Sequence, residues 1–533
     1  MKTETRNILE NKWYLYLTSF FAGVSIMAVE LAASRLLAPY FSSSQIVWTM
    51  IIGTIMIAMA LGNVWGGRSA DKDPNPDKLY MRFIIAAIWI AAIPFIGKYI
   101  ILGISALLIV TVSHNLLVLA AFISCIVIFA FPLFLLGTTT PSLVKYSVDS
   151  LDDSGKVVGT LGAFQTIGSI IGTFLPTFLT IPTVGTAITF LIFSGILLII
   201  GFIYFFSKKI KIAKCMVATL LFLIFGLFGT SNSFAFWEKD LLYEGESVYN
   251  YLQVKDTQNS VILSTNVLFG VQSIMKKDTF LTGMYYDYAL AAPLMTGITK
   301  ESNGDVLILG MGTGTYARQC TNYFENLNIE GVEIDQKITA LASEYFALPN
   351  TINVTTYDGR AFLHVIDKKY DVIMIDAYQD ITIPFQMSSI EFFELVKTHL
   401  KDNGVMIVNM NMYSDQKDNI NDYLADTIAD VFDYIYTVDV TSSTNTELFA
   451  SQNKDMVNVL LANIESLSEE DLKMQMQKVA FNLVLYKKGD LILTDDKAPV
   501  ELLGMKVVDD LIEKELIYYK AVYKEKGIQG LLE

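Results

Sequence analysis

Cysteine and histidine are scarce in this sequence, and their scarcity excludes several kinds of site. Among 533 residues there are three cysteines, three histidines and 12 prolines. Cys125, Cys215 and Cys320 lie far apart in the chain, so they form neither the regular spacing of a disulfide framework nor a CxxC zinc motif. The histidines are equally scattered. We therefore expect no metal site.

Charged residues are also few, at 17% of the chain, and they are unevenly distributed. Residues 1–237 carry a net charge of +6, whereas residues 238–533 carry −21. The first part is strongly apolar and raises the mean hydropathy of the whole chain to +0.43. The chain therefore has two parts of different character. The acidity of the second part argues against nucleic acid as a partner.

Long apolar runs dominate the first part, and seven are long enough to cross a bilayer as helices. They are Tyr14–Leu37, Ile46–Trp65, Tyr80–Gly97, Leu116–Gly137, Val157–Leu179, Ala187–Phe206 and Cys215–Gly229. The shorter run Ile100–Val112 is expected to lie at the membrane interface. Further apolar runs follow the first, so it is not a cleaved signal peptide. We expect a multi-pass α-helical membrane domain over residues 1–237, in contact with the lipid bilayer.

Four glycines recur at short spacing in the fifth apolar run: Gly159, Gly162, Gly168 and Gly172. Small residues allow two helices to approach closely in lipid. This spacing therefore predicts that the fifth span packs tightly against a neighbour.

The second part changes to short strands and then to alternating strands and helices. Residues 238–300 are predicted to form a small β-subdomain. Buried strands are then predicted at Val306–Leu309, Ile329–Ile334, Ile352–Thr356, Tyr370–Ile375 and Gly404–Met410, with later strands near Tyr434–Val440 and Val457–Leu461. Helices separate most of these strands, and this alternation is typical of a doubly wound, mainly parallel sheet. We expect a Rossmann-like α/β domain over residues 301–533.

Residues suited to a nucleotide stand at the ends of three of these strands. Gly310, Gly312 and Gly314 form a turn after the first strand, where backbone can approach a ligand closely. Glu333 ends the second strand and can accept both hydroxyls of a ribose. Asp358 ends the third strand and can accept from an adenine amino group. The carboxyl ends of parallel strands meet at one edge, so an adenosine site is predicted there; a tight turn without a ligand is the alternative.

Asp376 ends the fourth strand and would face the reactive end of such a ligand. A carboxylate there can orient an amine nucleophile and take its proton. A helix N-cap is the alternative role. Thr315 stands where a dinucleotide motif has its third glycine, which makes a dinucleotide less favoured than an adenosine ligand.

Several short segments carry a family resemblance. They are Ser247–Tyr251, Gln272–Ser273, Tyr285–Tyr288, the glycine turn, Val332–Asp335, Asp358–Arg360, Asp376–Tyr378 and, in the first apolar run, Glu30–Tyr40. Together they resemble the membrane-fused spermidine synthase-like proteins, members of the polyamine aminopropyltransferase family. The resemblance covers about three quarters of the chain.

The resemblance implies a fold and an activity. The fold is a Rossmann-like domain of the class I methyltransferase type. The reaction transfers an aminopropyl group from decarboxylated S-adenosylmethionine, a co-substrate that is not permanently bound, to putrescine. The products are spermidine and methylthioadenosine. A small cationic amine is therefore an expected partner, and a homodimer is left open.

The resemblance also assigns roles to individual residues. Asp376 would be the catalytic base. The co-substrate would be bound by Gly310, Gly312, Gly314, Gln272, Glu333, Asp358 and Gly359. The amine would be bound by Tyr286, Asp287, Tyr378 and Asp380.

The sequence departs from the family pattern at three positions. Thr313 stands where soluble spermidine synthases carry an Asp that helps to hold the aminopropyl amine, and Gln379 replaces a second Asp. Asp287 replaces the usual His or Gln after the pocket tyrosine. Two alternatives therefore stay open. One is a methyltransferase that uses intact S-adenosylmethionine. The other is a transporter or sensor whose soluble domain binds a polyamine or nucleoside without turnover.

Two arguments disagree about the side of the cell membrane on which the second part lies. The co-substrate is made in the cytosol, which favours a cytosolic catalytic domain. The basic loops 68–78, 145–156 and 208–214 fall on the cytosolic side if the N-terminus is cytosolic, and seven spans then place the second part outside. We expect the cytosolic location.

Overall fold

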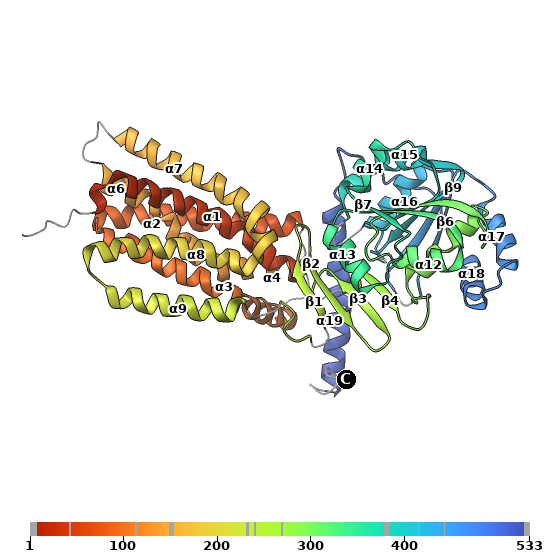
Figure 1. Cartoon of the computed structure of the whole chain (residues 1–533), viewed down its shortest axis with the longest axis horizontal. Helices are drawn as coiled ribbons and strands as arrows, with labels where there is room; N and C mark the ends of the chain where they lie inside the picture. Colours follow the sequence, from red (N-terminus) through yellow and green to blue (C-terminus); the bar gives the residue numbers. More distant parts are fainter. Residues whose placement is uncertain are drawn as a thin grey trace, which may run out of the picture. The chain divides into compact units, whose positions relative to one another are not determined.

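The computed structural model describes residues 8–41, 44–111, 115–148, 154–230, 234–238, 241–267, 270–377, 383–412, 414, 416–441 and 443–526. The chain forms two compact units, Met1–Glu238 and Lys239–Glu533, and each is described by itself (Figure 1).

The first unit is built from helices. They are η1 (Ile8–Glu10), α1 (Lys12–Phe41), α2 (Gln45–Lys72), α3 (Pro76–Thr111), α4 (Leu116–Cys125), η2 (Ile126–Ala130), α5 (Phe131–Gly137), α6 (Thr139–Ser147), α7 (Ser154–Leu175), η3 (Pro176–Thr180), α8 (Ile181–Lys208) and α9 (Ile212–Thr230). The elements η2 and η3 are π-helical turns, and Pro132 and Pro176 lie beside or within them. Proline lacks the N–H that an α-helical turn needs, so widened turns at these positions are expected.

Six helical segments in the described ranges are long and apolar enough to cross a membrane. They are Lys12–Phe41, Gln45–Lys72, Pro76–Ile109, Leu116–Ser147, Ser154–Lys208 and Ile212–Thr230. These segments indicate a multi-pass membrane domain. Residues 100–111, expected to form a separate short run, instead continue α3.

The fifth of these segments is unusually long and is interrupted. It has 55 residues, which at 1.5 Å per residue would extend roughly 80 Å, against a hydrocarbon core of about 30 Å. Gly185 has a non-helical backbone there (φ 83, ψ 171). The Thr189 hydroxyl donates to the Gly185 carbonyl at 2.8 Å and to Thr180 Oγ1 at 2.9 Å, so the chain is tied across the break. The fifth and sixth predicted spans lie on either side of Gly185, and seven crossings remain a prediction.

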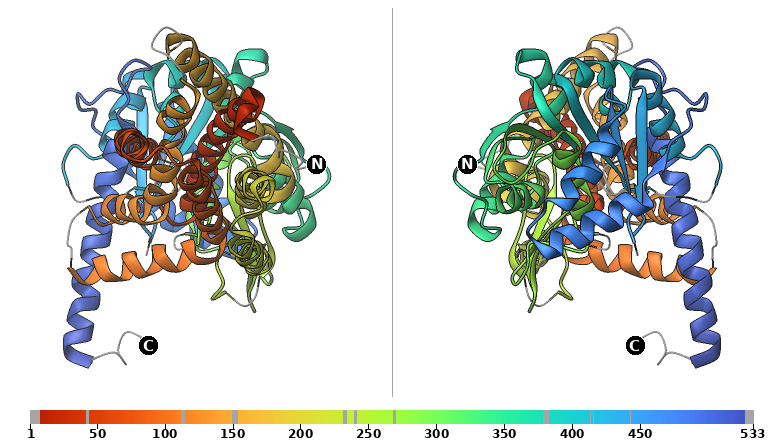
Figure 2. Two further views of the ribbon diagram at one scale, coloured as in Figure 1. Left: turned by 90° about the vertical axis from the view of Figure 1, so that its left-hand side faces the viewer. Right: turned by 90° about the vertical axis from the view of Figure 1, so that its right-hand side faces the viewer.

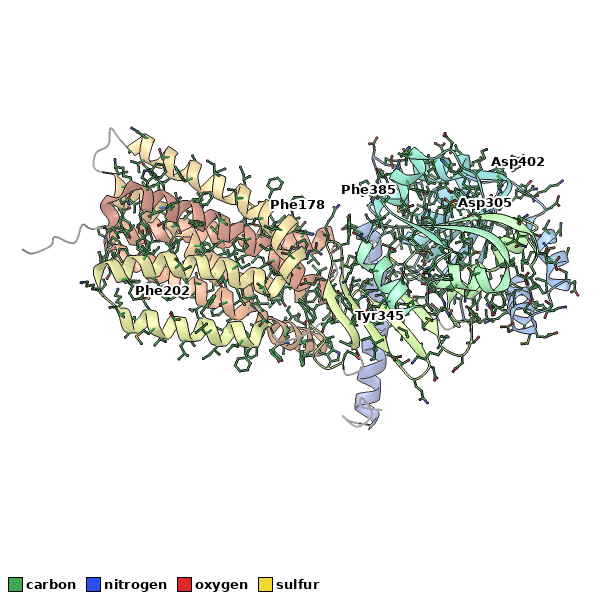
Figure 3. The ribbon with its side chains drawn as sticks, in the orientation of Figure 1. Phe178, Phe202, Asp305, Tyr345, Phe385 and Asp402 are labelled. Carbon is green, nitrogen blue, oxygen red and sulfur yellow. The ribbon has the colours of Figure 1, made fainter. Side chains whose placement is uncertain are left out.

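Large apolar side chains cover the outside of the helices of the first unit. Phe178, for example, is 73% exposed and projects away from the helix surface (Figure 3). Such outward-facing apolar surface is typical of helices that contact lipid.

Two of the four glycines in α7 meet the backbone of α1. A Cβ added at Gly168 would lie 2.0 Å from the Phe20 carbonyl oxygen, and one at Gly172 would lie 2.2 Å from that of Val24. Gly159 and Gly162 have no atom within 4 Å of their added Cβ. The expected close packing is therefore present at the C-terminal pair of glycines and absent at the N-terminal pair.

The second unit begins with a small antiparallel sheet in the order β1-β2-β3-β4. Its strands are β1 (Leu241–Glu246), β2 (Tyr251–Asp256), β3 (Ser260–Ser264) and β4 (Ser273–Lys276). The helices that follow it are α10 (Tyr285–Ala289) and α11 (Ala291–Met295).

The larger sheet has eight strands in the order β12-β10-β11-β9-β8-β5-β6-β7. Its elements are β5 (Asn303–Leu309), α12 (Thr315–Tyr323), β6 (Asn326–Glu333), α13 (Gln336–Tyr345), β7 (Asn353–Thr356), α14 (Gly359–Val365), β8 (Tyr370–Ile375), η4 (Phe385–Met387), α15 (Ile390–Thr398), β9 (Leu400–Met410), α16 (Ile420–Val431), β10 (Tyr434–Asp439), β11 (Thr446–Ser451), α17 (Met456–Glu465), α18 (Glu470–Asn482), β12 (Val484–Leu485) and α19 (Val500–Lys526). Strands β5 to β9 pair in parallel, and β10, β11 and β12 add antiparallel pairs.

One predicted strand of this sheet was wrong, and one strand was missed. Val457–Leu461 was expected to be a strand, but it lies in α17, where Met456, Leu460 and Ile464 are buried at helical spacing. The β-branched Val457 and Val459 favour a strand, but the buried residues of the segment follow the 3.6-residue period of a helix. Strand β11, which lies beside β9 in the sheet, was not predicted, because Glu447 interrupts its apolar pattern.

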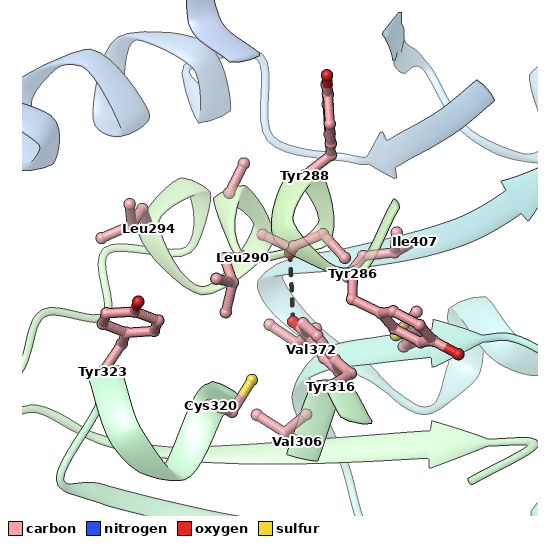
Figure 4. Close-up of a cluster of buried hydrophobic side chains, with 14 of the residues drawn as sticks. Tyr286, Tyr288, Leu290, Leu294, Val306, Tyr316, Cys320, Tyr323, Val372 and Ile407 are labelled. Carbon is pink, nitrogen blue, oxygen red and sulfur yellow. Dashed lines mark hydrogen bonds between the residues drawn. The ribbon is translucent and has the colours of Figure 1, made fainter. Parts of the chain in front are cut away.

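Hydrophobic layers cover both faces of the larger sheet. On one face, α10, α11 and α12 pack over Val306, Val372 and Ile407, and the Tyr316 hydroxyl donates to the Ala289 carbonyl at 3.3 Å (Figure 4). Helix α10 contributes Tyr285 to the cavity described below.

Substituting Gly168 by Ala should destabilise the membrane unit, because its new methyl group must displace the α1 backbone. We expect a loss of about 1–3 kcal/mol, the usual result of overpacking. The matched control is Gly159→Ala, which meets no neighbour and should be neutral or slightly stabilising because alanine favours helix. Thermal unfolding of the full-length protein in detergent measures both. Equal effects of the two substitutions would contradict the observed packing.

Candidate functional site

The ends of β5, β6 and β8 are tied together by backbone hydrogen bonds. The Gly310 N–H donates to the Val332 carbonyl and the Asp376 N–H donates to the Leu309 carbonyl, each at 2.9 Å. Gly310 has a φ of 85°, and a Cβ there would lie 2.6 Å from the Ala377 nitrogen. Only glycine therefore allows these strand ends to meet.

The glycine turn also lies against the small sheet. Gly312 has a φ of 53°, and a Cβ there would lie 2.6 Å from the Ser273 hydroxyl oxygen. That hydroxyl accepts from the Thr313 N–H at 3.2 Å. The glycine turn thus lies at the point where the two sheets of the second unit meet. Gly314 has a φ of 83° and precedes α12.

Glu333 is buried directly behind the glycine turn. Its carboxylate accepts from the Gly312 N–H at 2.9 Å and from the Asp335 N–H at 3.0 Å. Burial raises the pKa of Glu333, and the backbone donors oppose that increase. Each carboxylate oxygen can accept more than one hydrogen bond, and the assignment of Glu333 to the ribose hydroxyls remains a prediction.

Asp358 has a structural role that the sequence did not indicate. Its side chain accepts from the Ala361 N–H at 2.8 Å and caps α14, which begins at Gly359. Its assignment to the adenine amino group, and that of Gly359 to the co-substrate, remain predictions.

Asp376 is the central group of the site. The Tyr285 hydroxyl donates to Oδ2 at 2.7 Å and the Asn409 amide donates to Oδ1 at 3.0 Å. Burial raises the pKa of Asp376 to about 7; the two donors lower it and the negative charge of Glu333 raises it. The carboxyl is therefore poised to exchange a proton near neutral pH.

A cavity of about 220 Å³ lies in front of Asp376. Its lining residues are Gly270, Val271, Gln272, Met284, Tyr285, Asp376, Asn409, Asn411, Met412, Thr444, Asn445, Val507 and Val508. Two predicted site residues, Gln272 and Asp376, thus share one cavity. Glu333 and Asp358 are not among its lining residues.

Tyr285 lines this cavity, whereas the predicted Tyr286 is not among its lining residues. The Tyr286 hydroxyl donates to the Gln272 backbone carbonyl at 3.0 Å, and the two tyrosine rings lie 4.0 Å apart between centroids. Tyr286 therefore supports the wall of the cavity, whereas Tyr285 lines it and contacts Asp376. The sequence could not show which of these two adjacent tyrosines faces the cavity.

Asp287 points away from this cavity into a polar network. Its carboxylate accepts from the Thr282 N–H and hydroxyl, from the Gly283 N–H, and from the Gln319 side-chain amide, at 2.6–2.9 Å. These contacts hold the loop before α10. The other predicted amine ligands, Tyr378 and Asp380, lie outside the described residues.

Glu447 is a buried carboxyl that sequence reasoning missed. Asn409 pairs directly with Glu447 across β9 and β11, so their side chains share one face of the sheet with Asp376. Glu447 is completely buried, and neither carboxyl oxygen has a hydrogen-bond partner among the described residues. Burial, and then the charge of Asp376, raise the pKa of Glu447 well above its ordinary value. Its position directly before the apolar sequence Leu448-Phe449-Ala450 is the signal that could have identified Glu447.

Comparison with known proteins gives consistent matches. Residues 290–461 match the family model "Spermine/spermidine synthase domain". The chain is 52% identical over 347 residues to a probable polyamine aminopropyl transferase of Bifidobacterium longum, covering 62% of this chain and 77% of that protein. It is 24% identical over 297 residues to the polyamine aminopropyltransferase of Vibrio vulnificus, covering 53% of this chain and 97% of that one.

Among solved structures, the chain is similar to a probable spermidine synthase from Corynebacterium glutamicum. The sequence identity is 17%, the TM-score is 0.35, and the match covers 46% of this chain and 96% of that one.

Substituting Glu447 by Gln should reduce the loss of folding stability that occurs as the pH rises. The unfolded state releases this proton above about pH 4.3, whereas the folded state retains it. The folded state therefore binds more protons, and its stability falls as pH rises towards the folded pKa. The exposed Glu394→Gln is the control. Thermal unfolding of the full-length protein between about pH 5 and pH 9 tests this, and a Glu447→Gln curve parallel to the unsubstituted one would contradict a protonated Glu447.

Proposed function

The chain belongs to the polyamine aminopropyltransferase family, and on that premise we propose that its second unit transfers an aminopropyl group from decarboxylated S-adenosylmethionine to putrescine. The observation that carries this proposal is the ionisable carboxyl of Asp376, which lines a cavity and has a pKa of about 7. A general base of this kind is most effective when its pKa lies near the working pH.

The proposed reaction requires positioning and the removal of one proton. The ammonium of putrescine loses a proton to Asp376, and its nitrogen then attacks the carbon next to the sulfonium. A new carbon–nitrogen bond forms as the carbon–sulfur bond breaks, and methylthioadenosine leaves with the electron pair. The sulfonium charge already activates this leaving group, so no acid or metal is needed to expel it. The protein's tasks are therefore alignment of the two reacting atoms and proton acceptance.

The donor site is proposed at the strand ends beside Asp376. Glu333 would accept the ribose hydroxyls, Asp358 the adenine amino group, and the glycine turn would let backbone approach the ligand. Thr313 stands where the family has an Asp. Its hydroxyl is buried without a hydrogen-bond partner among the described residues, and it is the polar group available there for the aminopropyl amine.

We place the second unit in the cytosol, because the donor is made there. Contacts within the first unit support the opposite location, outside the cytosol, which the positions of the basic loops favour. Lys145 pairs with Asp71 at 2.9 Å and Lys211 pairs with Asp77 at 3.0 Å, so the three basic loops lie at one end of the helices. The chain passes through α9 before it enters the second unit.

In sealed right-side-out vesicles, a cytosolic site should turn over external substrates only after permeabilisation; turnover without permeabilisation would place it outside.

Substituting Asp376 by Asn should abolish turnover. With decarboxylated S-adenosylmethionine and putrescine, the unsubstituted protein should release methylthioadenosine, with kcat/KM rising with pH to a plateau above about 7 because only ionised Asp376 accepts the proton. The Asn variant should lose at least about a hundredfold in kcat, and the exposed Asp402→Asn should retain the activity. Absence of methylthioadenosine from the unsubstituted protein would refute the proposal. Release of S-adenosylhomocysteine from intact cofactor would indicate a methyltransferase instead.

Removing the Tyr285 hydroxyl should shift the pH profile. This hydroxyl stabilises the ionised carboxylate of Asp376, so Tyr285→Phe should move the acidic limb of kcat/KM to higher pH. A hydrogen bond to a charged group contributes about 1.5–3 kcal/mol, which corresponds to a shift of about one pH unit or more. Tyr286→Phe is the matched control, because its hydroxyl donates to the Gln272 carbonyl and not to Asp376. If the acidic limbs of the kcat/KM profiles coincide in the two variants, Tyr285 does not set the pKa of Asp376.

A further inference from the structure

The C-terminal helix α19 packs onto the body of the second unit. Val500 and Val507 are buried in the hydrophobic cluster that includes Met410 and Met412 of β9 and the segment after it, and Leu503 packs against that cluster. These residues recur at helical spacing, whereas Leu502 on the outer face is 60% exposed. The first turns of α19 make these contacts, and its C-terminal end lies away from the larger sheet (Figure 2).

This helix also reaches the cavity that contains Asp376. Val507 and Val508 line the cavity together with Met284 and Met412. The remaining lining residues are largely polar, and they include Tyr285, Asp376, Asn409 and Asn445. The cavity is thus lined by both polar and apolar side chains. An α,ω-diamine has the same pattern, with charged ends and a methylene chain between them.

The size of the cavity also fits a short diamine. The cavity volume of about 220 Å³ is well above the roughly 10–15 Å³ that a single water needs, so it has room for a small molecule. A short diamine in it would place its methylene chain against apolar side chains such as Val508. Packing against these side chains would then discriminate between acceptors of different length.

We propose that α19 forms the wall that sets the length of the acceptor amine, and that Val508 is a specificity-determining residue. This inference rests on the proposed function. Val508 is half-buried and stands outside the hydrophobic cluster, whereas Val507 is 2% exposed and belongs to it. A smaller side chain at position 508 therefore enlarges the cavity without opening the core.

The test compares acceptors of different length in the full-length protein. Val508→Ala should raise the ratio of kcat/KM for cadaverine to that for putrescine by about fourfold, the factor that corresponds to one buried methylene group. Val508→Phe should raise the KM for putrescine while leaving the KM for decarboxylated S-adenosylmethionine unchanged. Leu502→Ala, on the exposed face of the same helix, should leave the ratio unchanged. Methylthioadenosine release measures each rate.

The outcomes separate this inference from the proposed function. If the unsubstituted protein releases methylthioadenosine but the cadaverine-to-putrescine ratio is the same in Val508→Ala and Leu502→Ala, α19 does not set acceptor length. If Val508→Phe changes the KM for the donor instead, position 508 belongs to the donor site. If no amine supports turnover by the unsubstituted protein, the proposed function itself fails, and this inference fails with it.

Discussion

The second unit depends on the meeting of β5, β6 and β8 at one edge of the larger sheet. Gly310 is the residue that permits it, because a Cβ there would overlap the backbone around Asp376 and Ala377. The same close approach brings two carboxyl groups, Glu333 and Asp376, near enough for one charge to raise the pKa of the other. Burial is the larger cause of the raised pKa of Asp376, and the charge of Glu333 adds to it.

Burial then gives the neighbouring residues their roles. Asp376 is ionisable near pH 7 because Tyr285 and Asn409 donate to it in surroundings that otherwise disfavour its charge. Glu447 lies on the same face of the sheet without donors among the described residues, and so it is held in the protonated state. Two carboxyl groups with different environments therefore differ in charge at neutral pH. This difference leaves Asp376 as the one that can exchange a proton with a ligand in the cavity.

The first unit follows a separate physical rule. Its helices have little to gain from burying apolar surface, because the surrounding lipid is equally apolar, and they associate by close contact instead. Gly168 and Gly172 provide that contact by allowing α7 to touch the backbone of α1. Gly159 and Gly162 have a similarly short spacing but meet no atom within 4 Å, which shows that short spacing alone does not identify the contact face.

Much of the architecture could be predicted from local pattern. Apolar runs located the helical segments of the first unit, and alternating strands and helices indicated the parallel sheet with Gly310, Glu333 and Asp376 at its strand ends. Where two patterns competed the prediction was less secure. Val457–Leu461 was taken for a strand because β-branched residues are common in strands, but the buried residues of α17 follow a helical period. Strand β11 was missed because a single acidic residue disrupted its apolar run.

The sequence by itself determined which chemical groups stand at the strand ends, because strand order and turn residues are encoded locally. Only the tertiary structure decided which groups share the cavity. Tyr285 lines the cavity, whereas Tyr286 bonds to the Gln272 backbone and Asp287 bonds to Gln319. Asn409 and two valines of α19 line the cavity together with Asp376. These residues are far apart in the chain. Their proximity depends on sheet order and helix packing, which no local pattern specifies.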